Sequence, residues 1–261
     1  MPVSTNIHIS KKFRMKDPIM IVGLPGLGSV GRLVAKHLIK ELKAKKFATL
    51  TSNYFPHNIV MLKNGTIRLL NNRFYYAATA KAIGRDIVIL TGDTQAITQK
   101  GQYAVNYKIT KFFKEYLKGS FIYTIGGYAS QEMSTGKVYA NATTKEIVKK
   151  FSGSDIIFGK SRGTIVGSAG MIIAYAKSMK VGGICLMGET ALNIDPGAAK
   201  SVIKVISKRL GIDVDTSELD KLAHTINEQV KALEKNVFPS GIQGFQQEGL
   251  PGGGERPSYI R

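Results

Sequence analysis

Short apolar runs alternate with amphipathic stretches along most of the chain. Residues 19–23 and 86–91 contain unbroken apolar runs, which are typical of strands buried on both faces. Residues 29–46 instead place Val30, Val34 and Leu38 at helical spacing, with lysines on the opposite face. The alternation of these two patterns predicts an α/β domain built on a largely buried sheet.

The same patterns place the remaining elements. We expect further strands at residues 47–53, 59–62, 66–70, 73–80, 121–125, 137–142 and 181–187. Further helices are expected at residues 98–118 and 167–180. Asn64 and Gly65 both tolerate a positive φ, so they predict a type I′ turn that joins two of these strands as a hairpin.

The C-terminal part of the chain has a different, purely helical pattern. Asp195 and Pro196 are typical of a helix start, as the capping residue and the first helical residue. Two amphipathic helices then fill residues 196–237, whereas residues 238–261 are rich in glycine and proline. We therefore predict an α/β core at 1–195, a helical hairpin packed on it, and a flexible tail that ends in a docking peptide.

Composition narrows the class of protein. The chain has 261 residues, 43% of them hydrophobic, which is enough apolar material for a sizeable core. Cys185 is the single cysteine, so a disulfide framework is excluded, and no apolar run has the length of a membrane span. Residues 1–16 contain no apolar signal segment. These features predict a soluble protein of the cytoplasm that does not act in a membrane.

Charge is unevenly distributed along the chain. The formal net charge is +19, and residues 1–118 hold 20 Lys and Arg against 5 Asp and Glu. This basic half suits an acidic partner. Nucleic acid is not the favoured partner, because many of the cations occupy solvent-facing helix positions and no RNA-binding signature or long basic block is present.

A glycine-rich turn follows the first predicted strand. Gly26, Gly28 and Gly31 match the G-x-G-x-x-G pattern that cradles a dinucleotide between a strand and a helix. The acidic residue that usually holds the ribose is missing at the end of the next strand, and Pro25 removes one backbone donor from the turn. Two interpretations stay open: a nucleotide or other small-ligand site, or close packing of the strand against the helix.

Two carboxylates stand at predicted strand ends. Asp93 follows one buried strand and Glu189 ends another, a position where α/β folds often build sites. Acid/base chemistry would need the two groups to meet, whereas each could equally cap backbone donors. An enzyme or small-ligand-binding protein that uses the glycine turn with Asp93 and Glu189 is therefore the alternative to a binding protein.

Other candidate chemistry is less developed. Residues 159–163 spell G-x-S-x-G, and Ser161, Asp195 and His224 follow the chain order of a hydrolase triad, although β-branched residues stand where a helix should open. The same stretch resembles the end of a P-loop with its first glycine one residue out of place. The four histidines lack metal-ligand spacing, so no metal site is predicted, and Cys185 is expected to be a buried, inert thiol.

The landmarks together resemble the proteasome assembly chaperone 2 family, archaeal branch, over about residues 17–235. The matching stretches are GLPGLGSVG at 23–31, LTGDTQ at 90–95, TIGG at 124–127, KVYANAT at 137–143, GTIVGSAG at 163–170, CLMGET at 185–190 and DPGAA at 195–199. The resemblance implies a phosphorylase-like, three-layer α/β domain with a mixed central sheet and a C-terminal helical addition. It also implies a homo-oligomer without established catalysis or cofactor.

The resemblance further implies a partner and a docking peptide. Proteins of that family bind proteasome core particles or their α subunits through a C-terminal peptide of a hydrophobic residue, a tyrosine and any residue. This chain ends instead in Tyr259, Ile260 and Arg261, so its tyrosine stands one position early. We expect these three residues to be the partner-binding residues, with an aromatic ring to bury and a terminal carboxylate to accept hydrogen bonds.

Overall fold

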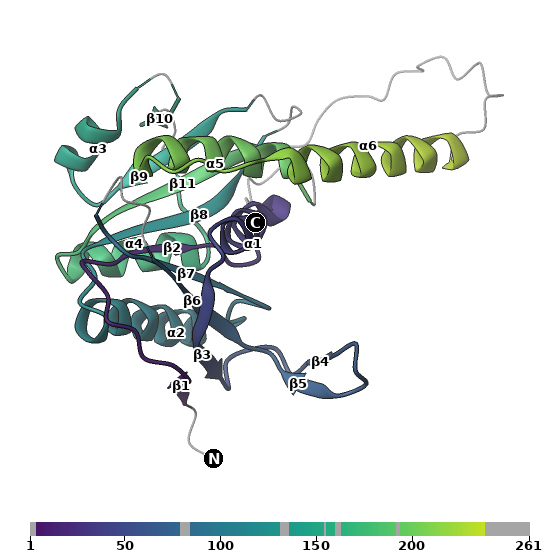
Figure 1. Ribbon diagram of the computed structural model, residues 1–261. Coiled ribbons are helices and arrows are strands. Elements are labelled where there is room, and N and C mark those ends of the chain that lie inside the picture. The colour runs from purple at the N-terminus through teal and green to yellow at the C-terminus, as the bar shows by residue number, and fades with distance from the viewer. Residues whose placement is uncertain are drawn as a thin grey trace, which may run out of the picture. The chain divides into compact units, whose positions relative to one another are not determined.

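A computed structural model of the chain describes residues 4–78, 84–130, 136–153, 155–159, 163–191 and 194–237, with side chains of the last helix to residue 229 (Figure 1). Among these residues, nine strands form one sheet in the order β1-β3-β6-β7-β2-β8-β11-β9-β10. The bounds of these strands are β1 Thr5–Ile9, β2 Ile19–Val22, β3 Lys45–Ser52, β6 Asn72–Ala77, β7 Ile87–Gly92, β8 Phe121–Ala129, β9 Val138–Ala142, β10 Ile157–Phe158 and β11 Gly182–Thr190.

The sheet is mixed, as the family resemblance implies. The four central strands β7, β2, β8 and β11 run parallel to one another. Strands β6, β3 and β1 extend the sheet on one side in successive antiparallel pairs, and β9 adds antiparallel to β11 on the other. The carboxyl ends of the central strands therefore meet at one edge of the sheet, which we call the carboxyl edge.

Helices cover both faces of the sheet and complete three layers (Figure 1). Their bounds are α1 Val30–Glu41, α2 Gln99–Lys111, α3 Lys145–Phe151, α4 Ser168–Ser178, α5 Pro196–Leu210 and α6 Ser217–Val237, with a short turn η1 at Leu27–Ser29 and a π-helical turn η2 at Phe112–Tyr116. Helices α1 and α5 share one apolar cluster with the sheet, and α2 and α4 share the other.

Alternation within single strands divides the core between these two layers. In β2, Ile19 and Ile21 belong to the cluster under α1 and α5, whereas Met20 and Val22 belong to the cluster under α2 and α4. Successive side chains of a strand point to opposite faces, so a strand buried on both sides must be apolar throughout. This is the physical reason for the unbroken apolar runs in the sequence.

The chain divides into two compact units, residues 1–223 and residues 224–261. The first unit contains the sheet, helices α1 to α5 and the first residues of α6. Asp195 caps α5 by accepting a hydrogen bond from the Ala198 N–H at 2.8 Å, with Pro196 in the first turn, as predicted. The predicted division into a core at 1–195, a hairpin at 196–237 and a tail at 238–261 stays a prediction.

Two local predictions are wrong. The helix expected over 29–46 ends at Glu41, because Lys43 takes a left-handed φ of 48° and the Ala44 N–H turns back to the Ile39 carbonyl. The turn at Asn64 and Gly65 is not type I′, since only Gly65 has a positive φ. The Asn64 side chain instead accepts a hydrogen bond from the Thr66 N–H at 3.2 Å.

Besides the two-residue strand β10, two elements have weak sequence signals and lie outside the predicted ones. Strand β1 is short and alternates between half-buried and exposed positions, as an edge strand does. Helix α3 has seven residues and is capped by Thr144, whose hydroxyl accepts from the Ile147 N–H. Both elements are too short for a periodic pattern to stand out.

Candidate interaction surface

The glycine-rich turn lies at the carboxyl edge, directly after β2. A Cβ atom on Gly23 would lie 2.0 Å from the Gly31 carbonyl oxygen, and one on Gly31 would lie 2.6 Å from the Ile125 carbonyl oxygen. Side-chain carbons cannot occupy those positions without moving backbone. These two glycines therefore let α1 approach β2 and β8 at backbone contact distance.

The other glycines of the motif also face this chain's own atoms. Gly28 has a left-handed φ of 61°, and a Cβ there would lie 2.7 Å from the Thr190 hydroxyl oxygen. A Cβ on Gly26 would meet the Gln95 amide at 3.6 Å. The Gln95 amide nitrogen also donates to the Pro25 carbonyl at 2.5 Å. Of the two interpretations of the motif, this geometry favours close strand and helix packing.

Asp93 lies at the same edge, bound by two arginines. Its carboxylate accepts hydrogen bonds from Arg68 at 2.5 and 3.0 Å, from Arg73 at 2.8 Å and from the Asn71 N–H at 3.0 Å. Burial alone would raise the pKa of Asp93, but these donors together hold it below its usual value. Asp93 is therefore an ionised, fully engaged anchor between β5, β6 and β7.

Glu189 lies elsewhere on the edge and does not meet Asp93. It is buried near the end of β11, and its backbone N–H donates to the Lys137 carbonyl at 3.1 Å. Burial and the nearby Glu189 carboxylate raise the pKa of Tyr139. Strands β7 and β11 are three positions apart in the sheet, which separates the two strands by about 14 Å. The structure thus does not bring them together for shared acid/base chemistry.

Of the predicted hydrolase residues, Asp195 and His224 lie within the described part of the chain. Ser161, and Lys160 of the P-loop resemblance, lie outside the described residues. Asp195 serves as the cap of α5, and His224 belongs to the second compact unit. Cys185 is buried in β11, where burial raises its pKa to about 11, so it matches the expected inert thiol.

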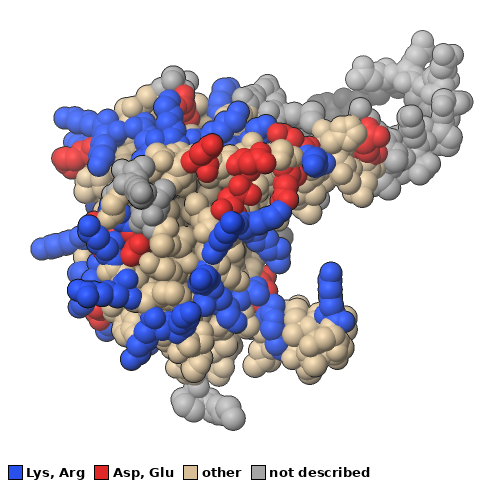
Figure 2. Space-filling view, viewed as in Figure 1, with Lys and Arg blue, Asp and Glu red and all other residues tan. Residues whose placement is uncertain are grey.

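An exposed apolar surface at the carboxyl edge is the two-stranded ribbon in the connection from β3 to β6. It consists of β4 (Ile59–Met61) and β5 (Ile67–Leu69), and in Figure 2 this lobe is mostly tan beside a body studded with blue. In its register Ile59 faces Leu69 and Met61 faces Ile67. All four side chains are exposed, and because paired residues share a face, they form one aliphatic surface. We call these four residues the hairpin face.

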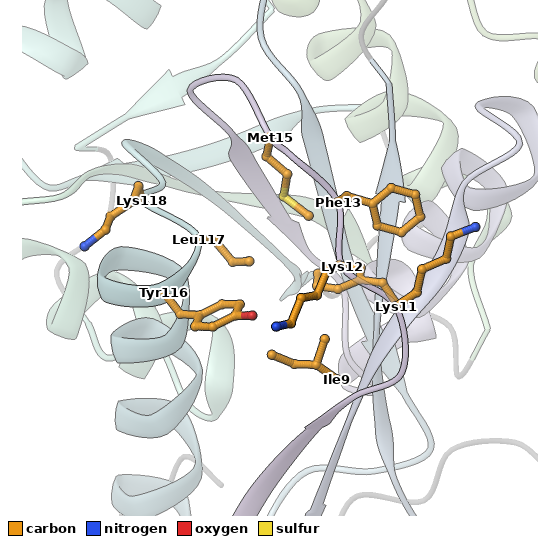
Figure 3. A pocket seen from close by; sticks show the side chains of 9 residues that line it. Ile9, Lys11, Lys12, Phe13, Met15, Tyr116, Leu117 and Lys118 are labelled. Carbon is orange, nitrogen blue, oxygen red and sulfur yellow. The ribbon is translucent and has the colours of Figure 1, made fainter.

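A pocket of about 270 Å³ lies at the opposite edge of the sheet, between the segment after β1 and the turn η2 (Figure 3). Phe13 anchors that segment by stacking on Tyr76 with ring centroids 4.3 Å apart. Lys12 and Tyr116 point toward one another across the hollow (Figure 3). The nine described residues that line the pocket are Ile9, Lys11, Lys12, Phe13, Met15, Phe47, Tyr116, Leu117 and Lys118. None of these nine is acidic, so the pocket suits an anionic group.

The architecture and its landmarks correspond to a known family. The family model described as the PAC2 family matches residues 20–234 of this chain. The chain belongs to the PAC2 family. The resemblance inferred from the seven sequence stretches is thereby confirmed, and the mixed sheet with helices on both faces is the fold of solved PAC2-type structures.

Three comparisons place the chain among archaeal PAC2 relatives. An uncharacterized protein of Methanocaldococcus jannaschii, MJ1210, is 37% identical over 85% of this chain and 84% of that protein. Pyrococcus furiosus PbaB, an archaeal proteasome activator, is 36% identical with a TM-score of 0.84, over 88% of this chain and 98% of that chain. Pyrococcus furiosus PbaA, an archaeal homolog of proteasome-assembly chaperone, is 24% identical with a TM-score of 0.73, over 88% and 92%. The likeness to PbaA shows the fold alone.

For this PAC2 protein, the predicted partner-binding residues Tyr259, Ile260 and Arg261 lie outside the described residues. In the part of the chain that is described, no helix has the length and apolar character needed to cross a bilayer. Nor do three or more described His, Cys, Asp or Glu side chains gather where they could hold a metal ion.

Sequence reasoning missed the hairpin face. The signal was present, since residues 59–62 are apolar at every position and would be read as a strand buried on both sides. The pairing of these two strands as a hairpin was predicted, but only the structure shows that, among the described residues, they pair with no strand of the main sheet.

Proposed function

We propose that this chain is an ATP-independent proteasome assembly factor, a homo-oligomer that binds proteasome α subunits or the core particle through its C-terminal tail. The observation that carries the proposal is PAC2 membership together with 36% identity to PbaB across 98% of that chain, a protein described as a proteasome activator. At this identity and coverage, the likeness extends beyond the fold to the sequence of the whole domain.

The geometry of the candidate catalytic groups supports a binding role rather than catalysis. The glycine turn is filled by the chain's own backbone and Thr190, Asp93 is neutralised by two arginines, and Glu189 lies three strands away. An enzyme built on these groups would need space and free carboxylates at one place.

Tail binding has a simple physical basis. In the proposed complex the Tyr259 ring is buried in a pocket between α subunits, and the carboxylate of Arg261 accepts charge-assisted hydrogen bonds. Several tails on one oligomer raise the effective concentration for a ring of repeated pockets, so individually weak contacts give firm binding. The basic first half of the chain, with 20 Lys and Arg against 5 Asp and Glu, adds attraction to an acidic ring face.

Native mass spectrometry with proteasome α subunits and core particle from the same organism tests the proposal. We expect the full chain to form complexes and a form ending at Ser258 to form none, because the ring and the terminal carboxylate are lost. A Ser258→Ala variant keeps the last three residues and should bind like the full chain. Equal binding by the shortened form, with circular dichroism showing an intact fold, would contradict the tail mechanism.

Activation of a finished core particle is the second candidate function, favoured by the description of PbaB as an activator. Peptide hydrolysis by pre-assembled core particle separates it from assembly. An activator raises hydrolysis when added to complete particles, whereas an assembly factor changes only the rate or yield at which α and β subunits form particles.

A further inference from the structure

The hairpin face is an unusually exposed aliphatic surface. Ile59 is 52% exposed, Met61 84%, Ile67 64% and Leu69 69%. Their cross-strand pairing puts all four on the same side of the ribbon, while Val60 and Arg68 pair on the other side. Four aliphatic side chains exposed to this extent form a patch on the order of 500 Å², comparable to the largest apolar patch of a typical monomer, which is often functional.

The ribbon is fixed to the body of the domain rather than left to move freely. Arg68, on its opposite side, binds both oxygens of Asp93 and also donates to the Leu69 carbonyl at 3.1 Å. Asp93 in turn is held by Arg73 and the Asn71 N–H. The ion pairs therefore secure one side of the ribbon and leave the aliphatic side facing outward.

Burial of the hairpin face against another protein surface would stabilise the ribbon. Isolated two-stranded hairpins are marginal in water, and three or more strands or a packed apolar face are normally needed. Among the described residues, β4 and β5 pair only with each other, so the outer backbone edge of each strand lacks a strand partner. Covering the face would remove its aliphatic side chains from water.

The distribution of charge on the chain indicates which kind of partner buries the hairpin face. The chain carries a net charge of +19, so two copies repel each other wherever their basic surfaces meet. The hairpin face carries no charge: within 59–69 the ionisable residues are Lys63 at the tip and Arg68, which is paired on the other side. An acidic partner would be drawn to the basic surfaces, whereas a second copy of this chain is best accommodated here.

We propose that the hairpin face is the surface through which two copies of this chain associate, face against face. The pairs Ile59 with Leu69 and Met61 with Ile67 offer similar aliphatic surfaces to a symmetric partner, as an isologous contact requires. A stable dimer contact buries about 800 Å² per partner, so the face supplies most of one and its surroundings the rest. The inference rests on the proposed function, which includes a homo-oligomer, and it assigns the surface through which the copies associate.

A single-thiol labelling experiment tests this proposal. Cys185 is fully buried with a raised pKa, so a cysteine introduced on the surface is the reactive thiol of the folded chain. Met61→Cys places it on the hairpin face, and Val166→Cys is the matched control, because Val166 is also 84% exposed. The reagent is a maleimide, and the labelling rate is compared between dilute and concentrated protein.

We expect Met61→Cys to be labelled at least about tenfold more slowly in concentrated than in dilute protein, because only the dissociated fraction reacts. Val166→Cys should be labelled at the same rate at both concentrations. In parallel, native mass spectrometry should show that the double variant Met61→Lys with Ile67→Lys is monomeric. The Val166→Lys variant should keep the oligomeric state of the wild type. Thermal unfolding of each variant verifies that the domain stays folded.

Two results would overturn the inference. One is a wild-type chain that remains monomeric at high concentration, and the other is an oligomer in which Met61→Cys reacts as fast as Val166→Cys. Neither result bears on tail-dependent binding to α subunits, which the form ending at Ser258 tests separately. A monomeric wild type would also contradict the oligomer in the proposed function, whereas a fast-reacting Met61→Cys in an intact oligomer would overturn the hairpin contact alone.

Discussion

The glycine turn and the β4–β5 hairpin lie at the same edge of the sheet but differ in packing: the turn is tightly packed and the hairpin is open to solvent. In the turn, the position of a Cβ on Gly23 is taken by backbone atoms of α1. In the hairpin, a Cβ on Gly65 would meet nothing within 4 Å. One region is packed to backbone contact and offers no surface, and the other offers an open aliphatic surface without a catalytic group.

The difference shows that a motif and a site need not coincide. Ligand-binding proteins use the G-x-G-x-x-G pattern, yet here its glycines accommodate the protein's own backbone and side chains. The hairpin contains no motif, but its exposed aliphatic face is the feature that folding alone does not explain. The following predictions test this contrast, from the largest expected effect to the smallest.

Gly23→Ala should cause the largest loss. The added carbon would lie 2.0 Å from the Gly31 carbonyl oxygen and 2.7 Å from the Ala35 Cβ, so α1 must move away from the sheet. We expect the free energy of unfolding to fall by about 3 kcal/mol or more, measured by urea denaturation. Gly163→Ala is the control, since a Cβ there meets nothing and should leave stability unchanged. A tolerated Gly23→Ala would refute the close-packing interpretation.

Asp93→Asn should cause an intermediate loss of stability, and it should also weaken the attachment of the hairpin through Arg68. The variant keeps the size of the side chain but loses the charge that pairs with Arg68 and Arg73, at a cost of about 2 kcal/mol at neutral pH.

The cost of Asp93→Asn should also depend on pH. Because folding lowers the pKa of Asp93 from its usual value of about 3.9, its stabilisation is complete above that value and disappears as pH falls through the lower, folded pKa. The stability difference between wild type and variant should therefore narrow below about pH 4. A difference that stays constant from neutral to strongly acidic pH would mean that the charge of Asp93 does not matter.

Gly65→Ala should have the smallest effect. The added methyl group has free space, and only the φ of 80° at this position disfavours a side chain, at a cost of about 1 kcal/mol. We expect faster hydrogen exchange at the hairpin amides and an almost unchanged global unfolding transition. If the global stability fell as far as for Gly23→Ala, the ribbon would be part of the cooperative core and the contrast would not hold.

The layered fold could be predicted from the sequence because its signals are long. The unbroken apolar run at residues 87–90 is typical of a strand that is buried on both faces, and all four of these residues are buried. Helix α1 was predicted too long because Lys43, which ends it in a left-handed conformation, is not a residue type that marks helix ends. Local backbone geometry of this kind depends on the next strand, which a periodic pattern does not report.

The surfaces were less predictable because they depend on which elements neighbour each other. Asp93 and Glu189 have equivalent positions in the sequence pattern, but only the strand order reveals the separation between them. Arg68 gave no signal that it binds Asp93, since Arg68 lies on β5, Asp93 follows β7, and their contact depends on the placement of the hairpin. Met61 was expected within a strand, and its exposure follows from the isolation of β4 from the main sheet.

The position of β2 in the sheet has a consequence for how the chain folds. Ile19 pairs with Ile87 on one side and with Phe121 on the other, and β8 then pairs with β11 as far as Thr190. Strand β2 therefore has no central strand to pair with until β7 and β8 have left the ribosome. Because loops this long must close before the central contacts form, folding should be slow and largely post-translational, with an apolar strand unprotected in the nascent chain.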